Sequence, residues 1–159
     1  MMIRSVLAGL ILMGFTGAAA ADELGCVSTT FKLLSPDDKV CISSFDDPKV
    51  PGVTCHISQA RKGGWGQAFG LTEDPSNFSV ACRQTGPVTV DISKLPEHEQ
   101  AFTERTSIFF KATRIYRIPD VRHNTLVYMA VSSKLIEGSP ANAISTVPIM
   151  PWGSEKLGK

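Results

Sequence analysis

The sequence predicts an α+β domain that consists mainly of antiparallel β-sheet with one or two short helices. Short runs of β-branched and aromatic residues recur along the chain, turns rich in Gly, Pro and Asp separate them, and helix-start signals are few. Hydrophobic residues make up 43% of the chain and charged residues 19%, which is typical of a folded globule and not of a disordered chain.

The first 21 residues have the layout of a secretory signal peptide. Arg4 supplies the positive charge near the N-terminus, an uncharged and mostly apolar stretch follows, and small residues lead up to Ala20 and Ala21. The apolar stretch is shorter than the about 20 residues of a spanning helix. A lipoprotein signal is disfavoured because Asp22 and Glu23 separate the apolar stretch from Cys26. We therefore predict cleavage near Ala20 or Ala21 and a single domain over residues 22–159.

The charges of the predicted mature domain balance. Without Arg4, 15 basic residues stand against 15 acidic residues. Such a surface creates no long-range field that would attract nucleic acid or anionic lipid. No later apolar stretch is long enough to cross a bilayer, so we expect no nucleic-acid partner and no stable membrane insertion.

Strands are expected wherever apolar residues alternate with polar ones between turn residues. The expected strands are 27–34, 39–45, 53–60, 78–83, 88–92, 106–118 (with a bulge) and 125–131. The last is almost entirely apolar and is expected to be a central strand buried on both faces. One or two helical turns are expected within 94–103, and Ser139-Pro140 indicates the start of a short helix that ends before Pro148. Pro151-Trp152 is expected to pack back on the body.

Four cysteines follow the predicted cleavage site, and an even number in an exported chain indicates disulfides. Cys55 and Cys82 each lie on the apolar face of their strand, so we expect them to pair in the core. Cys26 and Cys41 remain. A flush hairpin about the turn at 35–38 would leave these two roughly 20 Å apart, and their pairing then requires a bent or bulged N-terminal strand.

Several motifs distributed over residues 31–152 resemble those of a known family. They include Phe45-Asp46-Asp47-Pro48, Val53-Thr54-Cys55, Lys62-Gly63-Gly64, Gly70-Leu71-Thr72-Glu73-Asp74, Ala81-Cys82-Arg83-Gln84-Thr85-Gly86-Pro87 and Ile144-Ser145-Thr146-Val147-Pro148-Ile149-Met150-Pro151-Trp152. The chain thereby resembles the CreA family of small periplasmic bacterial proteins. The resemblance implies a periplasmic location, supports the Cys55–Cys82 pair, and carries over no catalytic activity or catalytic residue. Cys26 and Cys41 look like additions in this member.

Three groups of residues are candidates for a functional site. Asp46 and Asp47 are adjacent and would face opposite sides of a strand, which favours a turn over paired acid–base chemistry. The glycine-rich segment 62–70 lacks a phosphate-loop pattern, but Trp65 and Phe69 on it are candidates for a binding surface. Arginines are concentrated between residues 105 and 122, and Arg105, Arg114 and Arg117 are candidates for binding a carboxylate or phosphate.

No catalytic motif stands out in the sequence. His56, His98 and His123 have no metal-binding spacing, and Cys55-His56 would face opposite sides of a strand, so we predict no metal site, no cofactor and no catalytic residue. The sequence favours an exported binding or accessory module whose partner is an unknown small molecule or periplasmic protein. The alternative is a periplasmic enzyme with an unrecognised active site.

Overall fold

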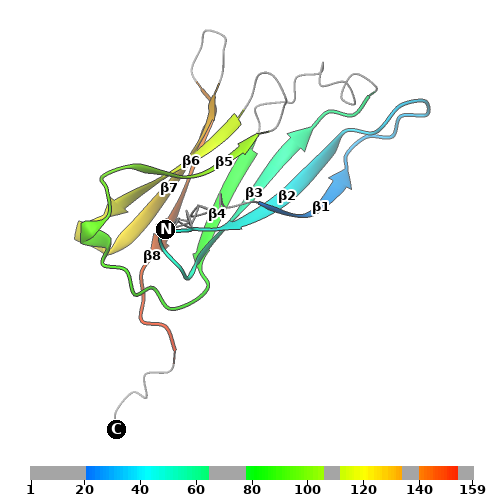
Figure 1. Cartoon of the computed structure of the whole chain (residues 1–159). Coiled ribbons are helices and arrows are strands. Elements are labelled where there is room, and N and C mark those ends of the chain that lie inside the picture. The colour runs from blue at the N-terminus through cyan, green and yellow to red at the C-terminus, as the bar shows by residue number, and fades with distance from the viewer. Residues whose placement is uncertain (1–20, 65–77, 106–111, 134–139, 154–159) are drawn as a thin grey trace, which may run out of the picture.

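The computed structural model describes residues 21–64, 78–105, 112–133 and 140–153. Within these ranges the chain forms two four-stranded antiparallel sheets, with strand orders β1-β2-β3-β4 and β5-β6-β7-β8 (Figure 1). The strands are β1 (Asp22–Ser28), β2 (Lys39–Asp46), β3 (Val53–Arg61), β4 (Phe78–Gln84), β5 (Glu99–Arg105), β6 (Ala112–Asp120), β7 (Thr125–Ser133) and β8 (Asn142–Pro148). Within each sheet, strands that follow one another in sequence are therefore paired, and the chain passes from one sheet to the other between β4 and β5.

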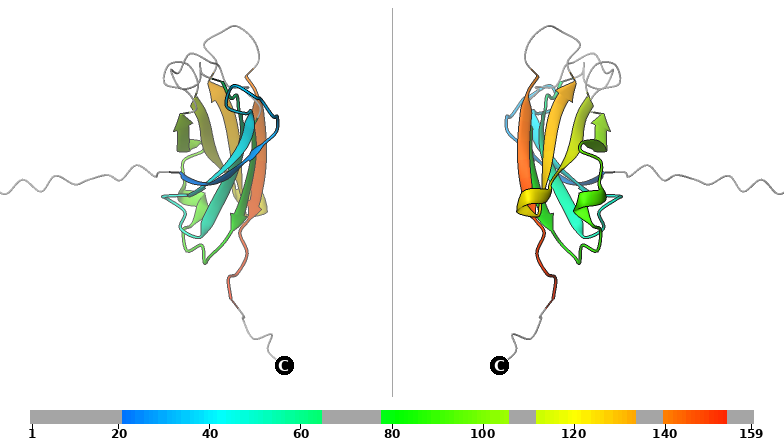
Figure 2. Two further views of the ribbon diagram at one scale, coloured as in Figure 1. Left: turned by 90° about the vertical axis from the view of Figure 1, so that its right-hand side faces the viewer. Right: turned by 90° about the vertical axis from the view of Figure 1, so that its left-hand side faces the viewer.

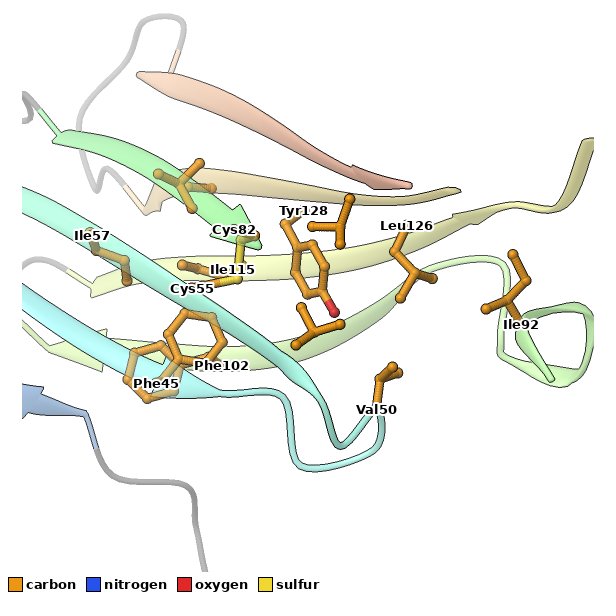
Figure 3. Close-up of a cluster of buried hydrophobic side chains, with 14 residues drawn as sticks. Phe45, Val50, Cys55, Ile57, Cys82, Ile92, Phe102, Ile115, Leu126 and Tyr128 are labelled. Atoms are coloured by element: carbon orange, nitrogen blue, oxygen red, sulfur yellow. A yellow bond between two sulfur atoms is a disulfide. The ribbon is translucent and has the colours of Figure 1, made fainter. Parts of the chain in front are cut away.

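The two sheets form two layers that enclose the core (Figure 2). Strands β4 and β8 lie side by side where the layers meet, and the backbone N–H of Cys82 donates a 2.8 Å hydrogen bond to the Ser145 hydroxyl. Deeper in the core the rings of Phe45 and Phe102, one from each sheet, stack with their centroids 4.3 Å apart (Figure 3). The buried residues include Val50, Val53, Cys55, Ile57, Cys82, Ile115, Leu126, Tyr128, Ala130 and Val147.

Alternation along the strands explains this core. In β3 the odd-numbered residues from Val53 to Gln59 are buried, and in β6 Thr113, Ile115 and Arg117 are buried between more exposed neighbours. The strands expected at 39–45, 53–60, 78–83 and 125–131 are all present. Strand β7 is central, as predicted, but only one of its faces is fully buried.

The helical part of the predicted fold class is wrong. The described residues contain no α-helix, only two three-residue 3₁₀ helices at Ile92–Lys94 and Val121–His123. The segment expected to form a helix before Pro148 is strand β8 instead. Its Ile, Thr and Val favour a strand, and pairing with β7 satisfies its backbone. Pro148 is tolerated because it ends an edge strand.

Two strand predictions are wrong, at 88–92 and at 29–34, and the strand predicted at 106–118 is described only from Ala112 on. Residues 88–92 form no strand, because Val88 and Ile92 pack against the core from a connecting segment that leads into the first 3₁₀ helix. The segment 94–103 holds the end of that helix and the start of β5. Strand β6 begins at Ala112, and residues 106–111 of the expected long strand lie outside the described ranges. Strand β1 ends at Ser28, so 29–34 is not a strand.

Candidate functional site

Both expected cysteine pairs are bonded. Cys55 and Cys82 face each other across β3 and β4, with their sulfur atoms 2.00 Å apart, and Cys26 and Cys41 do so across β1 and β2, at 2.02 Å. The offset expected for a flush hairpin does not arise, because residues 29–38 form a long loop and the register places Cys26 directly opposite Cys41.

The predicted arginine group is divided between the two faces of its sheet. Arg114 points outward from β6 and is exposed, whereas Arg117 on the same strand points inward and is only 1% exposed. Arg105 ends β5 opposite Ala112, and its side chain is outside the described part of the chain, as are Trp65 and Phe69. Among the predicted binding residues, only Arg114 and Arg117 have described side chains, and these two lie on opposite faces of β6.

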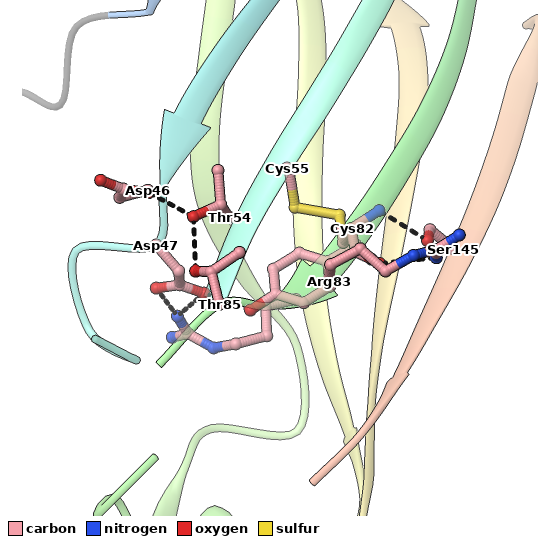
Figure 4. Close-up of a disulfide and its surroundings, with 10 residues drawn as sticks. Asp46, Asp47, Thr54, Cys55, Cys82, Arg83, Thr85 and Ser145 are labelled. Carbon is pink, nitrogen blue, oxygen red and sulfur yellow. Dashed lines mark hydrogen bonds and ion pairs between the residues drawn. A yellow bond between two sulfur atoms is a disulfide. The ribbon is translucent and has the colours of Figure 1, made fainter. Parts of the chain in front are cut away.

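Arg117 belongs to a buried cluster of charged and polar groups at the end of β2. Its Nη1 donates to both carboxylate oxygens of Asp47, at 2.5 and 2.7 Å, and its Nη2 donates to Glu99. The Tyr128 hydroxyl donates to Asp47 at 2.7 Å, and Lys49 pairs with Glu99 at the surface. Figure 4 shows the Asp47 carboxylate facing this network, whereas the neighbouring Asp46 accepts a hydrogen bond from Thr54.

Asp47 also organises the turn between β2 and β3. Its Oδ1 accepts hydrogen bonds from the backbone N–H groups of Lys49 and Val50, at 2.9 and 3.1 Å. Burial, and next the neighbouring Asp47 carboxylate, raise the pKa of Tyr128 far above its ordinary value, so its hydroxyl stays protonated. The described groups of this cluster bond mainly to one another, which fits a role in joining the two sheets.

The loop between β1 and β2 carries a different kind of surface. Phe31, Leu33 and Leu34 are 83–85% exposed, although large apolar side chains are normally covered. Together we call these three side chains the apolar loop patch. The strand predicted over 27–34 does not reveal this patch, because the observed strand ends at Ser28. The missing alternation at Leu33-Leu34, just before the turn residues 35–38, was the available signal.

Two aspartates hold this loop in place. Asp37 accepts a 2.6 Å hydrogen bond from the Lys32 backbone N–H, and Asp38 accepts one of 2.6 Å from the Lys32 ammonium and one of 2.7 Å from the N–H of Gly63. Gly63 also packs so closely that a Cβ atom there would lie 2.0 Å from the Pro36 carbonyl oxygen. The described start of the predicted glycine-rich binding segment therefore lies against the loop that carries the apolar patch.

Protonation of Asp38 is expected to loosen this loop below pH 3.8. The hydrogen bond from Lys32, and next that from Gly63, lower the pKa of Asp38 below its ordinary value of 3.8. Since the folded-state pKa is lowered, the contribution of Asp38 to stability is complete above the unfolded-state pKa and is lost as the pH falls through the folded-state pKa. In an NMR titration the Gly63 amide should shift with a midpoint below 3.8. Asp38→Asn should abolish the transition, and a midpoint at or above 3.8 would contradict the assignment.

A second exposed apolar region follows β8, at the end of the molecule opposite the apolar loop patch (Figure 1). Met150 is 65% exposed and Trp152 is 53% exposed, so the expectation that Pro151-Trp152 packs back on the body is wrong. The backbone here is nevertheless tied to β4, because the Gln84 amide both donates to the Met150 carbonyl and accepts from its N–H, each at 2.9 Å.

One group in the described residues has metal-ligand spacing. Ligand atoms of Glu23, Cys26 and Cys41 lie within 4.8 Å of one another. Cysteine binds metals as a thiolate, and both sulfur atoms here are committed to the disulfide, so the oxidised chain offers only the carboxylate. In the described ranges no helix has the length and apolar character needed to cross a membrane.

Comparison with known proteins finds a match to one protein family. The model of the CreA protein family matches residues 24–152. The Protein CreA of Escherichia coli strain K12 is 43% identical over 146 residues, which cover 90% of this chain and 92% of the relative, and the proteins of strains O6:H1 and O157:H7 match equally well. No solved structure matches the chain. With a family match across almost all of residues 22–159 and this level of identity, the chain belongs to the CreA family.

Proposed function

We propose that this CreA-family protein is an exported periplasmic binding or accessory protein, which docks onto another protein through the apolar loop patch. The main support for this proposal is that Phe31, Leu33 and Leu34 are exposed. The loop on which they lie is held in shape by Asp37 and Asp38. Holding the loop in advance reduces the entropy cost of binding. Covering each of these side chains would contribute about 1.5–3 kcal/mol.

Export is supported by the predicted leader and by the two disulfides, which persist in oxidising compartments. The corresponding measurement is the intact mass of the native protein. We expect this mass to correspond to a chain that begins at residue 21 or 22. A native protein that begins at Met1 would contradict export.

Binding is favoured over catalysis because the buried cluster of ionisable groups that the described residues form faces inward. Asp47, Arg117 and Tyr128 are buried and bonded to one another, so they leave no open position for a reacting atom. Arg114 is exposed on β6 and stays a predicted anion contact.

Docking can be tested by photo-crosslinking in the native compartment, with the crosslinker at Ser35 beside the patch. The triple variant Phe31→Ser, Leu33→Ser, Leu34→Ser is expected to lose the crosslinked protein and to weaken its Kd at least about 100-fold, because anchor residues contribute about 2 kcal/mol or more each. The matched control is Ile144→Ser, Met150→Ser, Trp152→Ser, which removes three exposed apolar side chains elsewhere and should bind normally.

Two results would overturn the proposal. One is an unchanged crosslinked protein in the loop variant, whose fold is verified by circular dichroism. The other is binding of the wild-type chain to vesicles of phosphatidylethanolamine and phosphatidylglycerol without any protein crosslink, which would make the patch a membrane contact.

A further inference from the structure

The two disulfides differ in how a second molecule can reach them. Cys55 and Cys82 are both 0% exposed, enclosed between the sheets. Cys26 is exposed on the edge strand β1, and its partner Cys41 is buried on β2. A thiolate must touch a sulfur atom to break a disulfide, so in the folded chain attack is expected at Cys26, the exposed residue of this pair.

Strand β1 depends on this bridge to an unusual extent. All seven of its residues are exposed, and it pairs only with β2. Apart from Ala21, which precedes it and packs partly against the core, its attachments to the described residues are the backbone ladder, the bridge, and the 2.7 Å ion pair from Arg61 to Glu23. A strand without buried side chains gains little from the hydrophobic effect, so breaking the bridge should release it locally.

The surroundings of Cys26 also suit the reduced state. A carboxylate oxygen of Glu23 lies 3.7 Å from the Cys26 sulfur, and Arg61 holds the other oxygen. After reduction the Cys26 thiol can donate to this carboxylate, whereas the bridged sulfur has no hydrogen to donate.

We propose that Cys26–Cys41 is a thiol–disulfide exchange site for a protein dithiol of the Cys-x-x-Cys class, and that the exchange releases or secures strand β1. The attacking thiolate forms a bond to the Cys26 sulfur, the Cys26–Cys41 bond breaks, and Cys41 leaves as a thiolate that takes up a proton. The second thiol of the reductant then displaces Cys26 and forms the reductant's own disulfide. The dithiol loses two electrons, and this chain gains two thiols. This exchange does not depend on the docking function proposed above.

The first test uses the buried bridge as an internal control. The folded, oxidised protein is treated with dithiothreitol, and cysteines are alkylated at intervals and located by mass spectrometry. Cys26 and Cys41 should be modified roughly 100-fold or more faster than Cys55 and Cys82, because the buried pair becomes accessible only on global opening. Equal rates, or faster modification of Cys55 and Cys82, would overturn the proposal.

The second test addresses the protein partner. A thioredoxin whose second active-site cysteine is replaced by serine cannot complete the reaction, so it should remain as a mixed disulfide on Cys26. Cys26→Ser should abolish this adduct. An adduct on Cys41, or no adduct on the wild-type chain, rules the site out.

The third test separates local release from misfolding. In the variant Cys26→Ser, Cys41→Ser, the β1 amides should exchange hydrogen at least about tenfold faster than in the oxidised protein, while amides of β3 and β7 keep their protection. Unchanged exchange in β1, or loss of protection throughout the sheets, would show that the bridge does not control this strand.

Discussion

Replacing Arg117 with alanine is expected to reduce the free energy of unfolding by about 3–5 kcal/mol, because it leaves the buried Asp47 carboxylate without its cation. Asp47 and Arg117 are 2% and 1% exposed, so water cannot replace the lost partner in the folded state. The Tyr128 hydroxyl and two backbone N–H groups would still donate to Asp47, but none of them carries a positive charge. Urea denaturation followed by circular dichroism measures the effect.

Arg114→Ala is the matched control for this change. It removes the same side chain from the same strand, three residues away and on the outward face, and should alter the free energy of unfolding by no more than about 0.5 kcal/mol. A loss below about 1 kcal/mol for Arg117→Ala, or equal losses for both variants, would mean that the buried pair does not join the sheets. In a double-mutant cycle with Asp47→Ala, the two changes should be strongly non-additive because the side chains are in direct contact.

Removing the core disulfide with Cys55→Ala, Cys82→Ala is expected to cost about 3–5 kcal/mol. A bridge across 27 residues of sequence restricts the unfolded chain by an amount worth about 3.5 kcal/mol in the loop-entropy model. Both sulfur atoms are also fully buried in the core, so their removal leaves unfilled volume between the sheets. The same denaturation experiment, on protein whose other bridge stays oxidised, gives the value.

The edge bridge provides the comparison. It spans 15 residues, for which the same model gives about 3 kcal/mol. We nevertheless expect Cys26→Ser, Cys41→Ser to lower global stability by much less than this value. Strand β1 has no buried side chain, so it can detach before the two sheets separate. Equal losses for the two double variants would show that β1 unfolds together with the core.

Much of the sheet structure follows from local pattern. The alternation around Cys55 and Cys82 placed both residues on inward faces, and the structure confirms their pair. The β8 error has the opposite origin: Ser139-Pro140 resembles a helix start, but pairing of Asn142–Pro148 with β7 prevails over that local signal. Alternation also separates Arg114 from Arg117, since they lie three residues apart on one strand, and the grouping of arginines along the sequence concealed this.

The sequence by itself determined the composition of a neutral, β-rich domain, the family, most strand positions and the faces on which Cys55 and Cys82 lie. These properties depend on side-chain order along the chain, because a strand has a period of two residues whatever packs on it. Only the tertiary structure decided that Arg117 meets Asp47 between the sheets and that Phe31, Leu33 and Leu34 stay uncovered. Burial depends on which surface the second sheet covers, and that surface comes from residues far away in the sequence.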